Sequence, residues 1–273
     1  MSKHDVLTEE EMSTFVPHRA VLWHIEQYQK KMNLRKEDLH ILDWGCGRGR
    51  SVAYLREQGY NAFGVDIDPK PIRNGKQLFL ERGLDFNKIL TLIDQDGRTR
   101  LSDGFFHFIY SESVFEHIEN IESVATEFKR ITSPGGIGLH LYPAHRYIVE
   151  GHLRMPFVHW LPKTKLSRIY IWLFLLLGQG PKWKELEGKS IREQAEVYFD
   201  YSVNKTYYRN CYTVKKTFTR KGFDIDFVTI DHPKLKEYPA FYRISTFKPL
   251  RVMMNWALVN FCAVFLLTTR KAD

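Results

Sequence analysis

The chain has 273 residues, 44% of them hydrophobic and 26% charged, which is ordinary for a globular protein with a complete core. Three cysteines, Cys46, Cys211 and Cys262, are too few and too scattered for a disulfide framework or a zinc cluster, and they favour a reducing, cytoplasmic setting. The net charge of +8 suits an anionic partner, but lysine and arginine form no dense run, so a nucleic-acid partner is disfavoured.

The N-terminal residues are charged and contain no apolar stretch, so we expect no signal peptide. Residues 9–32 predict one or two helices, because apolar side chains such as Phe15, Val21 and Ile25 recur at helical spacing. We expect residues 1–38 to form an N-terminal helical cap of the kind that covers a cofactor cleft.

Short apolar runs alternate with helical patterns over the next hundred residues. The expected strands cover residues 40–42, 61–65, 89–93, 105–110 and 137–142, and the expected helices cover residues 51–58, 71–83 and 121–131. Gly59 and Gly83 end the first two of these helices. Such alternation predicts a parallel, doubly wound sheet with helices on both faces.

A glycine-rich segment joins the first expected strand to the first core helix. Residues 43–49 read Asp-Trp-Gly-Cys-Gly-Arg-Gly, with a glycine at every second position. Without a Cβ, the backbone can turn tightly there and approach a ligand closely. Asp66 closes the second expected strand, where its carboxylate could accept hydrogen bonds from a ribose diol. The two features together predict a nucleoside site, and Asp43 suggests a ligand with a cationic amine.

The glycine spacing argues against the two commonest nucleotide motifs. The dinucleotide pattern needs glycines at its first, third and sixth positions. Counting from Gly45 puts Arg50 at the sixth position, and counting from Gly47 puts Val52 there. A phosphate-binding P-loop is excluded because no Gly-Lys-Ser/Thr follows.

The segment resembles the cofactor loop of class I S-adenosylmethionine-dependent methyltransferases. The family pattern, acidic-x-Gly-x-Gly-x-Gly, is matched at residues 43–49, and Asp66 matches the acidic residue of the second strand. Residues 101–118 resemble the fourth strand with the helix after it, and residues 130–138 resemble the Pro-Gly-Gly turn before the fifth strand. The resemblance implies an S-adenosylmethionine-binding core over residues 39–142. It also implies a Rossmann-like, mostly parallel sheet of seven strands with an antiparallel last strand.

The same resemblance implies which residues bind the cofactor. Asp94 and Asp96 follow the third expected strand, and one of them should lie near the adenine amino group. The full set of expected cofactor-binding residues is Asp43, Gly45, Cys46, Gly47, Gly49, Asp66, Ile67, Asp94, Asp96 and Ser111.

An aromatic-rich insertion, residues 143–210, interrupts the alternating pattern after the fifth strand. It resembles the lids of methyltransferase active sites, and a subdomain that only packs against the core is the alternative. Residues 211–273 should complete the core with a helix at 214–222, a strand at 223–230 and a last, antiparallel strand at 263–270.

Three histidines are candidates for a general base. His117 belongs to a Glu-His pair that matches the family, although it could simply fix the local turn. His145 and His152 lie in the insertion, where His159 continues a seven-residue spacing, but Gly151 and Pro156 make one continuous helix implausible. We expect no metal site, because no carboxylate–histidine pair shows familiar ligand spacing.

The resemblance implies transfer of a methyl group from S-adenosylmethionine, and we expect a small-molecule or glycan-like acceptor that is methylated at a hydroxyl. The glycan option comes from a resemblance to bacterial methyltransferases associated with surface-polysaccharide gene clusters. A catalytically inactive cofactor-binding scaffold and an RNA methyltransferase are the alternatives. The sequence does not indicate an oligomeric state.

Two apolar runs raise the question of membrane contact. Residues 169–178 are too few to span a bilayer, and residues 252–269 reach only the lower limit. Asn255 and Asn260 interrupt the second run, so we expect a helix followed by a buried strand there. Peripheral attachment to the inner face of the membrane is the alternative.

Overall fold

A computed structural model describes residues 13–94 and 96–271 of the chain, so the first part of the expected cap lies outside the described residues. Its centre is a seven-stranded sheet in the order β3-β2-β1-β4-β5-β7-β6. The strands are β1 His40–Trp44, β2 Asn61–Asp66, β3 Leu90–Leu92, β4 Phe106–Glu112, β5 Thr132–Pro143, β6 Phe223–Phe227 and β7 Ala263–Arg270. The first five are parallel, and β7 runs antiparallel to both of its neighbours. The predicted doubly wound fold is confirmed.

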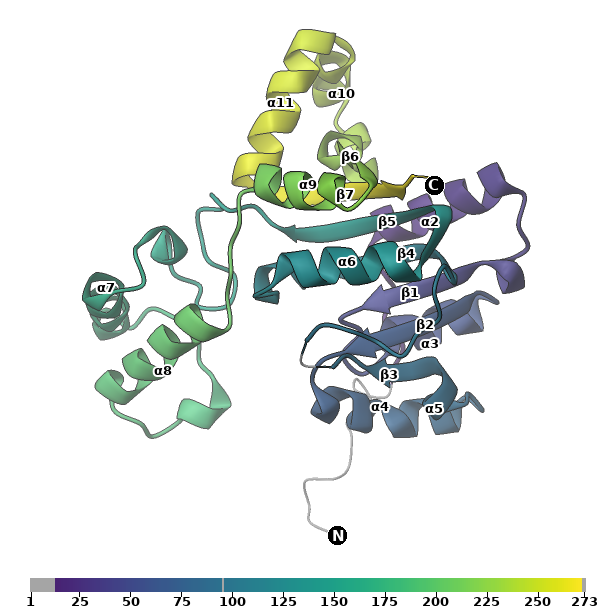
Figure 1. Cartoon of the computed structure of the whole chain (residues 1–273). Helices are drawn as coiled ribbons and strands as arrows, with labels where there is room; N and C mark the ends of the chain where they lie inside the picture. Colours follow the sequence, from purple (N-terminus) through teal and green to yellow (C-terminus); the bar gives the residue numbers. More distant parts are fainter. Residues whose placement is uncertain (1–12, 95, 272–273) are drawn as a thin grey trace.

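Helices cover both faces of this sheet (Figure 1). The helices of the described residues are α2 Arg19–Met32, α3 Arg50–Glu57, α4 Pro69–Glu81, α5 Phe86–Ile89, α6 Ile121–Ile131, α7 Lys165–Leu176, α8 Ile191–Asn204, α9 Cys211–Arg220, α10 Pro239–Thr246 and α11 Lys248–Phe261. One core lies between the sheet and α2, α3 and α4, and a second lies between the sheet and α6 and α9. Ile41 and Leu42 are both fully buried, on opposite faces, which explains why the inner strands read as apolar runs.

The strand expected at residues 223–230 and the helix expected within residues 9–32 have different bounds in the structure. The strand predicted for residues 223–230 stops at Phe227, and Thr229–Asp231 forms a short 3-10 helix. The Thr229 hydroxyl accepts the backbone N–H of Phe265 at 3.0 Å and thus replaces a ladder hydrogen bond beside β7. Of the predicted N-terminal helix, the described part begins only at Arg19, because the ring of His18 accepts the N–H of Ala20 and caps the helix there.

The insertion builds a small core of its own. Helices α7 and α8 pack together to one side of the sheet (Figure 1). Leu153, Met155, Ile171 and Tyr198 are almost completely buried between them and the preceding loop. The histidine-bearing stretch before α7 forms no α-helix, in agreement with the helix-breaking residues in it.

Residues 252–269 form the end of α11 and most of β7, so the predicted helix followed by a strand is confirmed. Strand β7 is buried between β5 and β6. In residues 13–94 and 96–271, no helix has both the length and the apolar character needed to cross a bilayer.

Candidate active site

The glycine loop between β1 and α3 has a backbone that only glycine adopts easily. Gly45, Gly47 and Gly49 have φ values of +87°, +55° and +74°, in the left-handed region. A Cβ on Gly45 would lie 2.4 Å from Cγ2 of Val114, closer than two carbons can approach. The N–H of Gly45 donates to the carbonyl of Val65 at 2.8 Å and ties the loop to the end of β2. The sequence pattern therefore reflects a real steric requirement.

Asp66 is held in place by the loop that it faces. One carboxylate oxygen accepts the N–H of Gly47 at 2.8 Å, and the other accepts the N–H of Asp68 at 2.9 Å. These bonds fix the plane of the carboxylate at the carboxyl end of β2, where Asp66 and the neighbouring Ile67 line a cleft. A carboxylate ordered in this way can accept hydrogen bonds from the two hydroxyls of a ribose diol.

Asp43 lies beneath the loop and does not line the cleft. Only 6% of its surface is exposed, and this burial raises the pKa of its carboxyl, an effect that nearby Glu112 reinforces. Glu112 in turn accepts the backbone N–H of His18 at 3.0 Å, which fixes the start of α2 above the site. Arg50 also binds the oxygens of Ser13, so residues 13–18 are fastened beside the loop. A cationic ligand group nearby would stabilise the ionised forms of the buried Asp43 and the half-buried Glu112.

The cleft has a volume of about 880 Å³. Five segments form its walls: the glycine loop, the end of β2, the β3–β4 loop, the 3-10 helix Phe115–His117 (η2) with the residues on either side of it, and α8 with residues 205–207. Of the predicted site residues, the cleft is lined by Gly45, Asp66, Ile67, Asp96 and His117.

The other predicted cofactor residues lie around the cleft rather than in its wall. Cys46 is buried, and its sulfur would lie 2.7 Å from a Cβ on Gly64, so it packs beneath the loop. Asp94 is exposed at the end of β3. Ser111 is fully buried and shares a 3.0 Å hydrogen bond with Nδ1 of His140, on the α6 face of the sheet. Their direct contact with a cofactor stays a prediction.

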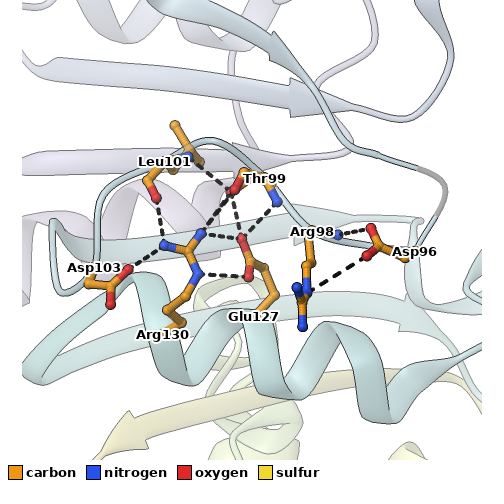
Figure 2. A network of polar contacts seen from close by, with 7 residues as sticks. All are labelled: Asp96, Arg98, Thr99, Leu101, Asp103, Glu127 and Arg130. Atoms are coloured by element: carbon orange, nitrogen blue, oxygen red, sulfur yellow. Dashed lines mark hydrogen bonds and ion pairs between the residues drawn. The ribbon is translucent and has the colours of Figure 1, made fainter.

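A polar network anchors the β3–β4 loop, which carries Asp96 (Figure 2). The buried carboxylate of Glu127 accepts both the N–H and the hydroxyl of Thr99, at 2.9 and 2.6 Å. Arg130 binds Glu127 at 2.6 Å and the carbonyl of Leu101 at 2.7 Å. Both α6 residues thus fasten the loop to the body of the fold, and the loop in turn positions Asp96 in the cleft wall.

The Arg130→Ala variant should lower the free energy of unfolding by about 2–3 kcal/mol, because it leaves the buried Glu127 carboxylate without its cationic partner. Urea denaturation measures this difference. Arg98→Ala is the matched control, since Arg98 pairs with Asp96 at an exposed position, and we expect a change of less than about 0.5 kcal/mol. Equal effects of the two substitutions would contradict an anchoring role for Arg130.

Two predicted catalytic histidines meet at the insertion side of the cleft. Nε2 of His117 lies 3.2 Å from Nε2 of His152, and Nδ1 of His117 donates to the carbonyl of Lys205 at 2.6 Å. Nδ1 of His152 lies 2.7 Å from the carboxylate of Glu150, which Tyr208 also contacts at 2.6 Å. Burial opposes ionisation of Glu150, but the hydrogen bonds from His152, Leu153 and Tyr208 lower the pKa of its carboxyl.

The third candidate, His145, is half-buried and does not line the cleft. Glu150 and Tyr208, which hold His152, were not predicted from the sequence. Tyr201, Lys205 and Tyr207, which line the cleft, were not predicted as site residues either. The density of aromatic residues in the insertion was the available signal, but it did not indicate which of them face the cleft.

The fold and the site define a doubly wound α/β protein with a nucleoside-binding loop at the carboxyl ends of its parallel strands. Residues 42–139 match the family model of a methyltransferase domain. The chain therefore contains a class I S-adenosylmethionine-dependent methyltransferase domain, and S-adenosylmethionine is the cofactor of that domain.

Several characterised proteins resemble the chain. The ubiquinone biosynthesis O-methyltransferase of Rickettsia conorii is 26% identical over 133 residues, which cover 49% of this chain and 44% of that protein. The tRNA 5-carboxymethoxyuridine methyltransferase of Escherichia coli K12 is 24% identical over 211 residues, covering 71% of this chain and 76% of that protein. A crystal structure of an S-adenosylmethionine-dependent methyltransferase from Mesorhizobium loti shares the fold, with a TM-score of 0.50 and 16% identity over 88% of this chain and 95% of that one. The chain thus spans only about half the length of the ubiquinone-pathway relative.

Proposed function

We propose that the protein transfers a methyl group from S-adenosylmethionine to a hydroxyl of a small-molecule or saccharide-like acceptor. The observation that carries the proposal is that Asp66 and His117 line the same cleft, one beside the glycine loop and the other beside the insertion. The cleft volume of about 880 Å³ is enough for a cofactor and a small acceptor together. The name of the Rickettsia relative, an O-methyltransferase, supports an oxygen acceptor.

The residues around the loop fit the cofactor. Asp66 would accept hydrogen bonds from the ribose hydroxyls, and the absence of a Cβ on Gly45 lets the backbone approach the ligand. The buried carboxyl of Asp43 and the half-buried carboxyl of Glu112 would favour the positively charged end of the molecule. When bound, S-adenosylmethionine supplies a methyl group on a cationic sulfur.

The chain's own residues then position and activate the acceptor. Tyr201 and Tyr207 line the cleft beside His117 and would pack against the acceptor's apolar faces. An acceptor hydroxyl beside His117 would pass its proton to Nε2 of His117, which lies 3.2 Å from Nε2 of His152 and would share the proton with it. Holding donor and acceptor in line provides much of the rate. The insertion that contributes both tyrosines would act as the lid.

Methyl-labelled cofactor incubated with the protein and fractionated cell extract tests this function. We expect label in a small-molecule or glycan fraction, and none when Asp66 is replaced by alanine. Label in RNA instead would support the alternative suggested by the tRNA methyltransferase relative, which aligns over most of this chain. Cofactor binding without labelling of any fraction would support a catalytically inactive scaffold.

We also propose that α10 and α11 rest on an anionic membrane surface. These helices project from the sheet (Figure 1), and Phe247, Val252 and Met253 are 60%, 70% and 58% exposed. Exposed Arg243 and Lys248 lie beside them and would meet anionic headgroups. A helix with aromatic and aliphatic residues on one side and cations at its end suits the membrane interface.

The double variant Val252→Ser/Met253→Ser should therefore bind vesicles of phosphatidylcholine with 30% phosphatidylserine at least about tenfold more weakly, because each side chain contributes roughly 1.5 kcal/mol or more when buried. Co-sedimentation measures the affinity. Leu80→Ser removes an equally exposed apolar residue from α4 and should leave binding unchanged. Vesicle binding that is absent in the unaltered protein, or equal in all three proteins, would contradict the proposal.

A further inference from the structure

The contact between His117 and His152 has an unusual electrostatic requirement. The Nδ1 atom of His117 faces a carbonyl and that of His152 faces a carboxylate, and both of these groups only accept hydrogen bonds. Both Nδ1 atoms must therefore carry the proton. In the neutral rings, the lone pairs of the two Nε2 atoms then face each other across 3.2 Å. A proton on one of the two nitrogens, or a metal cation bound by both, removes this repulsion.

A carboxylate completes the group. Glu116 lies in the same turn as His117, and only 3% of its surface is exposed. Its Oε2 atom has no hydrogen-bond partner among the described residues. Ligand atoms of Glu116, His117 and His152 all lie within 4.8 Å of one another. A buried carboxylate oxygen without a partner is costly in a folded protein, and a bound cation would satisfy it.

The separation of the two Nε2 atoms and the contacts of the two rings match those of a transition-metal site. Two nitrogens bound at about 2.1 Å to a tetrahedral ion lie about 3.4 Å apart, close to the separation seen here. Metal-binding histidines generally donate their other N–H to a carbonyl or a carboxylate, as His117 and His152 do. Tyr208 and the N–H groups of His152 and Leu153 hold the Glu150 carboxylate in turn. The Glu116 oxygen lies within 4.8 Å of the two nitrogens, so a shift of this side chain toward them is needed for it to bind the same ion.

We propose that Glu116, His117 and His152 bind one divalent transition-metal ion of the Zn²⁺ class, at the insertion side of the cleft. Three protein ligands leave a fourth position, and His117 is the ligand that reaches the cleft wall. A proton and the metal ion compete for the same two lone pairs. The ion's role rests on the proposed function: an acceptor hydroxyl bound at the fourth position would lose its proton more easily, and with both Nε2 lone pairs bound to the ion that proton would pass to water instead of the histidines. The binding itself does not depend on that function.

Titration of the metal-free, tag-free protein with Zn²⁺ alone, without cofactor or acceptor, tests the site by calorimetry. We expect one ion per chain, and at least 100-fold weaker binding when His152 is replaced by alanine. Co²⁺ should give the visible absorption of a four-coordinate site, a signal that a purely structural role for the histidines would not produce. Because cofactor affinity is measured separately, failure of the proposed methyl transfer would leave this result intact.

Two further variants separate metal binding from folding. Glu150→Gln keeps the size of the side chain but weakens the support of His152, and should lower Zn²⁺ affinity about 10–100-fold. His24→Asn removes a histidine from α2, outside the group, and should leave both stoichiometry and affinity unchanged. No binding by the folded protein, or equal affinity in all variants, would overturn the proposal.

Discussion

Replacing Asp66 with alanine should weaken S-adenosylmethionine binding by about 100-fold or more. The carboxylate is the group at the end of β2 that is oriented to accept hydrogen bonds from a ribose diol. Hydrogen bonds to a charged group contribute about 1.5–3 kcal/mol each, so the loss of two corresponds to about 3 kcal/mol or more. The substitution also frees the N–H of Gly47, which loosens the glycine loop. Isothermal titration calorimetry of the two proteins measures the difference.

Asp226→Ala is the matched control, because Asp226 is exposed on β6, outside the cleft. It removes the same charge and should leave the affinity within about twofold of the original. An Asp66→Ala protein that is folded and binds as tightly as the control would reject the ribose contact.

Gly45→Ala should cause the largest loss of stability of the substitutions considered. Its new Cβ would lie 2.4 Å from Val114, and the backbone would have to keep a φ of +87°. The left-handed backbone costs roughly 1–2 kcal/mol for a residue other than glycine, and forced overlap adds roughly 1–3 kcal/mol. We therefore expect the free energy of unfolding to fall by about 2–5 kcal/mol. Relief of the overlap would shift the loop, so cofactor affinity should fall as well.

Gly83→Ala separates these two causes. Gly83 has a φ of +64°, but nothing lies within 4 Å of its added Cβ, so only the backbone cost of roughly 1–2 kcal/mol should appear. Chemical denaturation of both variants gives the comparison. If Gly45→Ala were no more destabilising than Gly83→Ala, the close approach to Val114 would not be what requires glycine at this position.

Much of the core could be predicted because its signals are local in the sequence. Residues 43–49 and Asp66 are only about twenty positions apart, and the parallel pairing of β1 with β2 brings them together in any fold of this kind. Strand β7 was predictable for a similar reason, because its apolar run is typical of a buried strand. The glycines are required by the backbone conformation itself, which leaves a direct trace in the sequence.

The histidine cluster could not be predicted from spacing. His117 and His152 are 35 positions apart, and the loop before α7 that joins them to Glu150 has no regular period. The partner of Nδ1 of His117 is the backbone carbonyl of Lys205. Every residue has such a carbonyl, so the sequence does not show which one binds the histidine. The early end of β6 has a similar origin, because the hydroxyl of Thr229 competes with the strand only once β7 lies beside it.

The most direct test of the account is calorimetric titration of the unaltered protein with S-adenosylmethionine. The geometry of the glycine loop, the oriented Asp66 carboxylate and the neighbouring carboxyls of Asp43 and Glu112 lead us to expect saturable binding with one cofactor per chain. Absence of binding by a protein that is folded by circular dichroism would contradict the central claim that this cleft is a methyl-donor site.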